Sequence, residues 1–369
     1  MNRKIKVMHT EWSDGWGGQE IRIISEILGV KKVGIEVSLA CKADSMIKTK
    51  AIENDIEVFS LPFNGNTDLT TLYGLYKIIK KNNIDIVNTH SGKDTWVGGI
   101  AAKLAGVKFI RTRHLSNRIR SSRLNFINEL ADFIFTTGES VRADMVRYNR
   151  INPEKIQSVP TGIDENLFNE ENYSRKQCRD SFNIGEEETA VGIVAVLRAF
   201  KRHDRFVNLA KKIIDSESHV KPVKFFIAGD GPQKEAVEQK IRKLGMEKHI
   251  IMLGHVADVA SLLKALDIFI LTSDSKEGVP QSIMQALLMK KPVLATNAGS
   301  TGDLYHENNF VMVEKNDTNK MYEELLSLIN EENLKSDYSK KARPFVAENF
   351  GMTKMIENIT AIYSKILGG

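Results

Sequence analysis

The sequence of 369 residues contains no apolar run that approaches the roughly 18–20 residues of a membrane-spanning helix. Its basic first residues are followed by too few apolar residues for a signal peptide. The two cysteines, Cys41 and Cys178, lie far apart and belong to no disulfide or metal-binding pattern. These absences argue against a membrane-spanning or disulfide-stabilised protein and predict reduced thiols in the cytoplasm.

Nucleic-acid binding is not indicated either, although the chain carries a net charge of +5. Residues up to Asp164 contain 24 Lys and Arg against 18 Asp and Glu, whereas the remainder contains 28 against 29. No nucleic-acid-binding motif and no basic strand rich in aromatic residues accompanies this charge. The basic first half and nearly neutral second half therefore predict two parts with different partners, and no nucleic acid among them.

Strand-like and helix-like segments alternate along the chain, which predicts an α/β fold with doubly wound parallel sheets. In the first half, short apolar runs at 37–40 and 84–87 alternate with helical patterns at 69–81 and 96–104. The same alternation starts again at 191–197. The chain is long enough for two domains, each with its own core, and its hydrophobic fraction of 42% is typical of soluble proteins.

Residues 274–303 give the strongest indication of a binding site. Apolar runs at 268–271 and 293–296 predict buried parallel strands on either side of a helix over 281–289. Pro280 suits the first turn of that helix. The helix N-terminus should therefore point to the carboxyl edge of a parallel sheet, where open α/β folds bind anions.

Glu277 and Gln285 are the candidate ligand-binding residues of this stretch. Glu277 is predicted to be an exposed acceptor just before the helix, and Gln285 lies about one and a half turns into it. The two side chains could bind hydroxyl groups at opposite ends of one ligand, with phosphates on the N–H groups between them. The other interpretation is an ordinary βαβ connection with Glu277 in solvent.

Three histidines, His9, His90 and His114, follow strand-like runs at the predicted ligand edge of the first sheet. A single histidine is more often structural than catalytic. Three histidines at equivalent strand ends favour a site.

Two further segments could bind phosphate. Gly17 and Gly18 belong to a loop with three glycines that could bring backbone N–H groups close to a phosphate, although such a loop could also be a surface turn. Its spacing does not match the G-x-G-x-x-G fingerprint of dinucleotide-binding folds. Arg198 and Lys201 follow a predicted strand and could neutralise a diphosphate that gains charge as it leaves.

In their order and spacing, these motifs resemble the retaining glycosyltransferases of family 4, which have the GT-B fold. Glu277 matches the first Glu of that family's E-x7-E signature, and Gln285 replaces the second. The Gly-Asp-Gly-Pro sequence at 229–232 matches the family's G-x-G-P turn, and residues 158–164 resemble its V-P-N-G-V-D turn.

The resemblance covers nearly the whole chain and implies two Rossmann-like domains that face each other across a donor cleft. Residues 1–165 would form the acceptor-side domain, completed by the C-terminal segment 350–369. Residues 166–349 would bind the nucleotide sugar. The family's lysine is retained as Lys201, but Val196 stands in place of its usual arginine, for which Arg198 could compensate.

The resemblance also implies roles for individual residues. The first Glu of the signature contacts the donor sugar, the second position contacts the ribose, the Gly pair faces the diphosphate and Val256 is the expected base contact. The implied catalytic residues are His114, Lys201 and Glu277. The implied donor-binding residues are Gly17, Gly18, Arg198, Lys201, Val256, Glu277, Gly278, Val279, Pro280, Gln281, Ser282 and Gln285.

The implied reaction transfers a sugar from a UDP- or GDP-sugar to an acceptor hydroxyl with retention of anomeric configuration. The sequence contains no Asp-x-Asp motif, and a helix N-terminus with Lys201 can neutralise the leaving diphosphate. We therefore expect no metal and no cofactor besides the nucleotide-sugar substrate. No carboxylate is evidently placed as a nucleophile, which favours front-face attack assisted by the leaving phosphate.

Two alternative functions remain open. A sugar-nucleotide epimerase can share this fold, but it would need further acid and base carboxylates and no acceptor surface. A catalytically inactive GT-B subunit could instead act as a scaffold. Val196 and Gln285 favour the scaffold, whereas His114, Lys201 and Glu277 oppose it.

Seven Lys and Arg but no acidic residue lie between Lys103 and Arg123, interleaved with apolar residues. This segment is either a solvated face or a surface for anionic lipid headgroups or a pyrophosphate-bearing acceptor. The predicted contact residues are Arg111, Arg113, Arg118, Arg120 and Arg123. The second interpretation predicts a peripheral protein on the inner face of the cytoplasmic membrane. Its acceptor would be a lipid-linked, lipopolysaccharide or other polysaccharide glycan.

Overall fold

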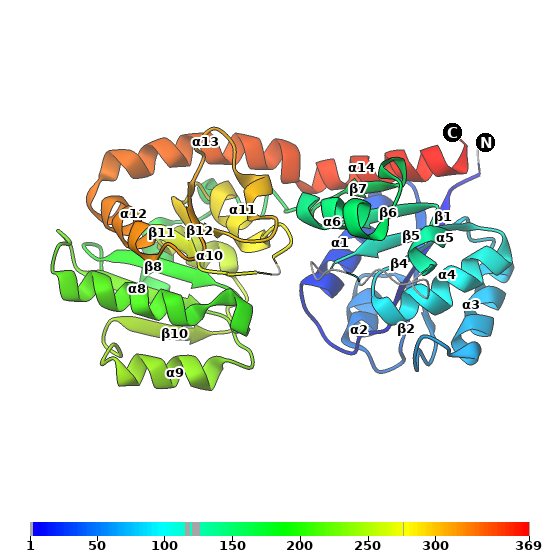
Figure 1. Cartoon of the computed structure of the whole chain (residues 1–369), viewed down its shortest axis with the longest axis horizontal. Coiled ribbons are helices and arrows are strands. Elements are labelled where there is room, and N and C mark those ends of the chain that lie inside the picture. The colour runs from blue at the N-terminus through cyan, green and yellow to red at the C-terminus, as the bar shows by residue number, and fades with distance from the viewer. Residues whose placement is uncertain (1–2, 115–118, 120–125, 276, 369) are drawn as a thin grey trace. The chain divides into compact units, whose positions relative to one another are not determined.

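The computed structural model describes residues 3–114, 119, 126–275 and 277–368. The chain forms two compact units, Met1–Gly162 with Met352–Gly369, and Ile163–Gly351 (Figure 1). The boundaries predicted after residue 165 and before residue 350 differ from the observed ones by three and two residues.

The first unit contains a seven-stranded parallel sheet in the order β3-β2-β1-β4-β5-β6-β7. Its strands are β1 (Lys6–Glu11), β2 (Glu36–Cys41), β3 (Glu57–Ser60), β4 (Ile86–Thr89), β5 (Lys108–Arg113), β6 (Phe133–Thr136) and β7 (Ile156–Ser158). Its helices are α1 (Gly18–Lys32), α2 (Met46–Glu53), α3 (Leu69–Asn82), α4 (Gly92–Ala105), α5 (Ile127–Leu130), α6 (Glu139–Asn149) and α14 (Met352–Leu367).

The second unit contains a six-stranded parallel sheet in the order β10-β9-β8-β11-β12-β13. Its strands are β8 (Thr189–Val194), β9 (Val223–Ala228), β10 (Ile250–Gly254), β11 (Ile268–Leu271), β12 (Val293–Asn297) and β13 (Val311–Glu314). Its helices are α7 (Arg175–Ser181), α8 (His203–Ser216), α9 (Lys234–Lys243), α10 (Val259–Ala265), α11 (Gln281–Leu288), α12 (Thr318–Asn330) and α13 (Glu332–Phe350).

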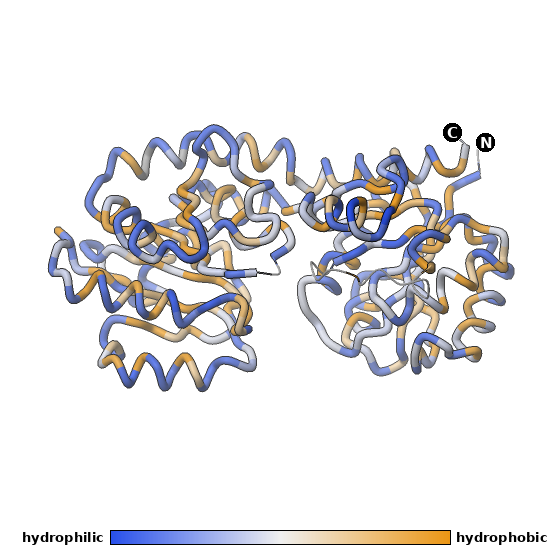
Figure 2. The backbone as a smooth tube through the Cα atoms, viewed as in Figure 1, coloured by the Kyte–Doolittle hydropathy of each residue, from blue (hydrophilic) through white to orange (hydrophobic). Residues whose placement is uncertain are grey.

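The central strands are apolar on both faces because helices cover both sides of each sheet. All four residues of β11 are buried, whereas helices such as α8 alternate between hydrophobic and hydrophilic residues (Figure 2). The buried side of α8 includes Phe206, Val207 and Ile213. The cores of the two units are therefore built in the same way, and the predicted fold of two doubly wound parallel sheets is confirmed.

The C-terminal helix α14 belongs to the first unit. Met355, Ile359 and Tyr363 of this helix are buried in the same core as residues of α1. No helix within the described part of the chain is long and apolar enough to cross a membrane. Cys41 and Cys178 are buried and free.

Candidate functional site

The topology places two pairs of loops where open α/β folds bind ligands. In the first sheet the chain order reverses between β1 and β4, and in the second sheet between β8 and β11. Parallel strands end at a common edge, and the loops diverge where the order reverses, which leaves a crevice at the strand ends. Lys201 and Glu277 lie in the segments after β8 and β11, and His90 directly follows β4. His9 lies within β1 rather than after it, because the strand continues to Glu11.

Lys201 and Glu277 form an ion pair at the reversal point of the second sheet. Lys201 Nζ lies 2.6 Å from Glu277 Oε1, and the two side chains are 16% and 6% exposed. Ser273 Oγ donates to the same carboxylate oxygen at 2.5 Å. Thr272 Oγ1 donates to the carbonyl of Lys201 at 3.0 Å, so the ends of β8 and β11 are also joined through the backbone.

The prediction that Glu277 is an exposed acceptor is wrong. Its residue is only 5% exposed, because Lys201 and Ser273 supply the charge and the hydrogen bond that a buried carboxylate needs. Ser273 was not among the predicted site residues. The only sequence signal for it is its position two residues after the end of an apolar strand.

The loop after β12 holds the backbone of Glu277. Ser300 N–H donates to the Glu277 carbonyl at 3.1 Å. Gly299 has a φ of +58°, and a Cβ built there would lie 2.1 Å from the same carbonyl oxygen. Only glycine fits this position. Gly299 therefore helps to hold the backbone of Glu277, a role that the sequence motifs did not indicate.

The Gly-Asp-Gly-Pro turn at 229–232 performs a similar function for the loop that leads to Lys201. Gly229 has a φ of +144°, and a Cβ there would lie 2.0 Å from the Ala195 carbonyl oxygen. Leu197 N–H donates to the Asp230 carbonyl at 3.0 Å. This close contact gives a physical reason for glycine in the turn.

The residues predicted to bind the donor lie in the second unit, except for Gly17 and Gly18. Val279 and Pro280 are buried at the start of α11, and Gly278, Gln281, Ser282 and Gln285 are half-buried. The N–H groups of Ile283 and Met284 donate to the Pro280 carbonyl. The N–H groups of Gln281 and Ser282 are therefore the ones at the open N-terminus of the helix.

Arg198 adjoins the Lys201–Glu277 pair through the backbone, since Lys201 N–H donates to the Arg198 carbonyl at 3.0 Å, whereas no such bond joins Val256 to the pair among the described residues. Arg198 is exposed and lines a pocket of about 490 Å³ together with Arg202 and Asp274. Arg202 is committed to ion pairs with Asp204 at 2.8 Å and Asp274 at 3.1 Å. Val256 is half-buried against the core of the second unit. Among the described residues, no hydrogen bond or ion pair joins Arg198 to Glu277.

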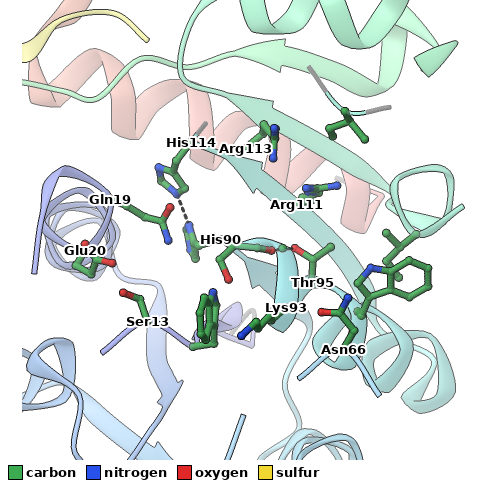
Figure 3. A pocket seen from close by; sticks show the side chains of 16 residues that line it. Ser13, Gln19, Glu20, Asn66, His90, Lys93, Thr95, Arg111, Arg113 and His114 are labelled. Atoms are coloured by element: carbon green, nitrogen blue, oxygen red, sulfur yellow. Dashed lines mark hydrogen bonds between the residues drawn. The ribbon is translucent and has the colours of Figure 1, made fainter. Parts of the chain in front are cut away.

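The three predicted histidines of the first unit lie in one hydrogen-bonded chain. His9 Nδ1 lies 2.8 Å from His90 Nε2, and His90 Nδ1 lies 2.9 Å from His114 Nε2, as the dashed line in Figure 3 marks for the second pair. His9 and His90 are buried, whereas His114 is half-buried and lines a pocket. The structure thus brings together the three strand ends that the sequence indicated separately.

The chain of histidines has a preferred direction. His9 Nε2 is buried and has no hydrogen-bond partner among the described residues. A buried N–H without an acceptor is rare, so we assign the lone pair to His9 Nε2 and the proton to its Nδ1. His9 then donates to His90, and His90 donates to His114. His114 is left with its proton on Nδ1.

Burial keeps these histidines uncharged. It lowers the pKa of His9 to about 3. The pKa of His90 is held well below its ordinary value by burial and by the neighbouring His9, His114 and Arg22. Burial, with the charges of Arg22 and Arg113, likewise lowers the pKa of His114 well below its ordinary value.

His114 borders a pocket of about 570 Å³ at the carboxyl edge of the first sheet (Figure 3). Its lining includes Trp12, Lys93, Trp96, Arg111 and Arg113. Arg111 is only 5% exposed and Arg113 is half-buried, so both line the pocket rather than an open surface. Their predicted contact with a membrane or an acceptor stays a prediction. Arg118, Arg120 and Arg123 lie outside the described residues.

The predicted glycine loop precedes α1. Gly17 N–H donates to Glu20 Oε2 at 2.9 Å, and Gly18 is the first residue of the helix. The N–H group of Gly17, which was expected to face a phosphate, thus donates to the carboxylate of Glu20 instead.

Two families match adjacent parts of the chain. The family described as Glycosyltransferase Family 4 matches residues 16–167, and the one described as Glycosyl transferases group 1 matches residues 174–345. The two matches follow one another without overlap; the first covers most of the first unit and the first five residues of the second, and the second lies within the second unit.

Among curated proteins, the chain is similar to the UDP-Gal:α-D-GlcNAc-diphosphoundecaprenol α-1,3-galactosyltransferase of Escherichia coli, at 24% identity over 98% of this chain and 97% of that protein. It is also 25% identical to the N-acetyl-α-D-glucosaminyl L-malate synthase of Bacillus anthracis, over 85% of this chain and 82% of that protein.

Among solved structures, a glycosyltransferase from Rickettsia africae matches with a TM-score of 0.90 and 21% identity, over 99% of both chains. HepE of Anabaena, solved in complex with UDP and glucose, matches with a TM-score of 0.82 and 20% identity, over 98% of this chain and 100% of that one. These structures have the same fold.

We predict that replacing His9 with leucine makes the first unit less sensitive to acid. In wild type the unfolded chain protonates His9 below about pH 6.5, whereas the folded chain, with a pKa of about 3, does not. Acid therefore favours unfolding through this group, by about 1 kcal/mol between pH 7 and 5.5. Glu11, whose pKa burial and Asp94 raise to about 8, acts in the opposite direction, so only the difference between variant and wild type is informative.

The measurement is the urea-induced unfolding free energy of both proteins at pH 7 and 5.5. His9→Leu should lose stability at pH 7, because His90 loses a hydrogen bond, but about 1 kcal/mol less at pH 5.5. His219→Gln, at an exposed position, is the control and should follow wild type at both pH values. An equal loss at both pH values would show that His9 is not held neutral.

We also predict that Gly299→Ala destabilises the second unit by about 1–3 kcal/mol, because alanine must adopt a positive φ and its Cβ overlaps the Glu277 carbonyl. Gly302→Ala, three residues along the same loop, has only the far end of Asn297 within 3.9 Å and should change stability by less than about 0.5 kcal/mol. Urea unfolding of the two variants checks this. Equal stabilities would mean that the loop does not hold Glu277.

Proposed function

Because the chain belongs to the family 4 glycosyltransferases with the GT-B fold, we propose that it transfers a sugar from a nucleotide-sugar donor to an acceptor hydroxyl with retention of anomeric configuration. The observation that carries the proposal is the buried Lys201–Glu277 pair at the reversal point of the second sheet. The E. coli relative has a UDP-sugar as donor, and HepE was solved with UDP and glucose, which supports a UDP-sugar here. A GDP-sugar is the alternative donor.

Lys201 acts on the leaving group. When the bond between the sugar and the diphosphate breaks, negative charge grows on the phosphate oxygens, and a cation fixed nearby stabilises the transition state more than the bound donor. Glu277 and the backbone of the loop after β8 hold Lys201 in place before the donor arrives. The open N-terminus of α11 adds N–H groups for the same phosphates.

Glu277 is a poor candidate for a nucleophile. Lys201 and Ser273 both contact its Oε1 atom, which leaves Oε2 to accept a hydroxyl of the donor sugar. Front-face attack, in which the leaving phosphate accepts the proton of the acceptor hydroxyl, yields retention without a covalent enzyme intermediate. We propose that this step needs no metal ion, since Lys201 and the helix supply the positive charge.

The first unit contributes His114 and the adjoining pocket to the acceptor. His114, as assigned, presents Nδ1–H as a hydrogen-bond donor, and the directed chain from His9 fixes this tautomer. The named acceptors of relatives include a diphosphoundecaprenol-linked sugar and a poly(ribitol-phosphate), which supports a lipid-linked or polysaccharide acceptor. A lipid-linked acceptor would be met at a membrane surface, where Arg118, Arg120 and Arg123 are the proposed contacts.

We predict that Lys201→Ala lowers kcat by about 10²–10³ while donor affinity falls less than about tenfold, because the charge acts mainly in the transition state. The readouts are nucleoside diphosphate release in the presence of acceptor and the thermal shift produced by UDP. Lys201→Arg should retain part of the rate, since it keeps the charge in a different geometry.

Lys211→Ala, on the exposed surface of α8, is the matched control and should retain the wild-type rate. A Lys201→Ala protein that still binds UDP and turns over like wild type would remove Lys201 from the mechanism. A wild-type protein that binds no nucleotide sugar and releases no nucleoside diphosphate would favour the scaffold.

A further inference from the structure

The pocket beside His114 contains a buried cation without a counter-ion. Arg111 is only 5% exposed, and its position in β5 pairs with Thr89 of β4 and Ile134 of β6. Within residues 3–114, 119, 126–275 and 277–368, no hydrogen bond or ion pair joins its guanidinium to another group. Burial first, and Arg113 second, lower its pKa to about 9, so it still carries its charge at pH 7.

The charge of Asp94 raises the pKa of Arg111, but neither Asp94 nor Glu20 forms an ion pair with the Arg111 guanidinium among the described residues. Asp94 accepts hydrogen bonds from Thr10 Oγ1 at 2.7 Å and from the backbone N–H groups of His90 and Ser91, both at 2.8 Å. Glu20, the one carboxylate among the residues that line the pocket, accepts the N–H of Gly17. Both carboxylates are therefore already committed to groups at the ends of their own helices.

A guanidinium has five N–H donors and no acceptor, and Arg111 lines the pocket while only 5% of the residue is exposed, so an anion that enters the pocket could pair with its charge. Arg113 and Lys93 line the same pocket and add positive charge beside Arg111. Trp12 and Trp96 supply ring surfaces beside them, and Lys93 Nζ lies 3.8 Å from the centroid of Trp12. Arg111, Arg113 and Lys93 are labelled in Figure 3 among the residues that line the pocket. A multiply charged oxyanion would neutralise this arrangement.

We propose that this pocket binds the phosphate or diphosphate group of the acceptor, with Arg111 as its principal ligand. The planar guanidinium can hold two phosphate oxygens at once, and the aromatic rings can contact the adjoining sugar or lipid. This inference rests on the proposed function in one respect: the phosphate is assigned to the acceptor because the donor is assigned to the second unit. It adds a substrate class, namely acceptors whose sugar is attached to a lipid through phosphate.

The test uses geranyl diphosphate as the probe, with geraniol, UDP and inorganic pyrophosphate in separate arms. Tryptophan fluorescence reports binding directly, because all three tryptophans of the chain lie in the first unit and two of them line the pocket. Wild type should bind geranyl diphosphate saturably and geraniol at least tenfold more weakly. Arg111→Met should weaken geranyl diphosphate about 10- to 100-fold, since it loses charge-assisted hydrogen bonds. Arg142→Met, which removes a cation from α6 outside the pocket, should bind as wild type.

Thermal stability separates a binding role from a structural one. If Arg111 is kept for a ligand, Arg111→Met should melt at the same temperature as wild type or higher, because a buried unpaired charge is removed. Geranyl diphosphate should raise the melting temperature of wild type but not of the variant. A lower melting temperature in Arg111→Met, combined with unchanged binding, would overturn the proposal and make Arg111 a structural residue.

Competition identifies the source of the phosphate. If UDP displaces geranyl diphosphate and loses the same affinity in Arg111→Met, the pocket binds the donor diphosphate and the acceptor assignment is overturned. Equal affinity for pyrophosphate and geranyl diphosphate would also overturn it, since the lipid would then contribute nothing. Binding that depends on Arg111, without any sugar transfer, would support the phosphate site and contradict the proposed function. Sugar transfer without binding that depends on Arg111 would support the proposed function and contradict the phosphate site.

Discussion

The parallel arrangement of the strands is the constraint on which the candidate site depends. Because every strand of a sheet ends at the same edge, loops that are far apart in sequence meet there, and the reversal of strand order opens a crevice between two of them. In the second unit this brings Lys201 and Glu277 within 2.6 Å across 76 positions of sequence, from 201 to 277. In the first unit it aligns His9, His90 and His114 in one chain.

The two edges handle charge differently. At the edge of the second sheet, cation and anion neutralise one another, and an incoming diphosphate would share Lys201 with Glu277. At the edge of the first sheet, burial keeps the histidines neutral and leaves the charge of Arg111 without a partner among the described residues. Under the proposed function, the first edge would bind an anion of the acceptor, whereas the second would stabilise the anion that forms during the reaction.

The sequence predicted the features that follow from local patterns. The predicted strand at 268–271 agrees with the structure residue by residue, and the strand at 293–296 and the helices at 69–81 and 281–289 agree to within one residue, because each is a short apolar run or an amphipathic segment with clear ends. The strands β7 and β13, with three and four residues, are too short to give a recognisable pattern, and both were missed.

The parts of the site that sequence could not predict depend on contacts between distant segments. Glu277 looked exposed because its ion-pair partner Lys201 is brought to it only by the sheet. Arg111 looked like part of a surface segment because the seven cations were counted along the chain. Only the position of β5 inside the sheet shows that Arg111 faces a pocket. Gly299 gave no signal because its clash partner, the carbonyl of Glu277, lies on another loop.

The most direct test of the central claim follows the anomeric proton of the transferred sugar by NMR while the purified protein acts on a nucleotide sugar and a lipid-diphosphate-linked acceptor. A retaining glycosyltransferase should form one glycosidic product for each nucleoside diphosphate released. The new linkage should have the anomeric configuration of the donor. A product with the opposite configuration would contradict the proposed front-face mechanism. Conversion of the donor into an epimer, with no new glycosidic bond, would contradict glycosyl transfer itself.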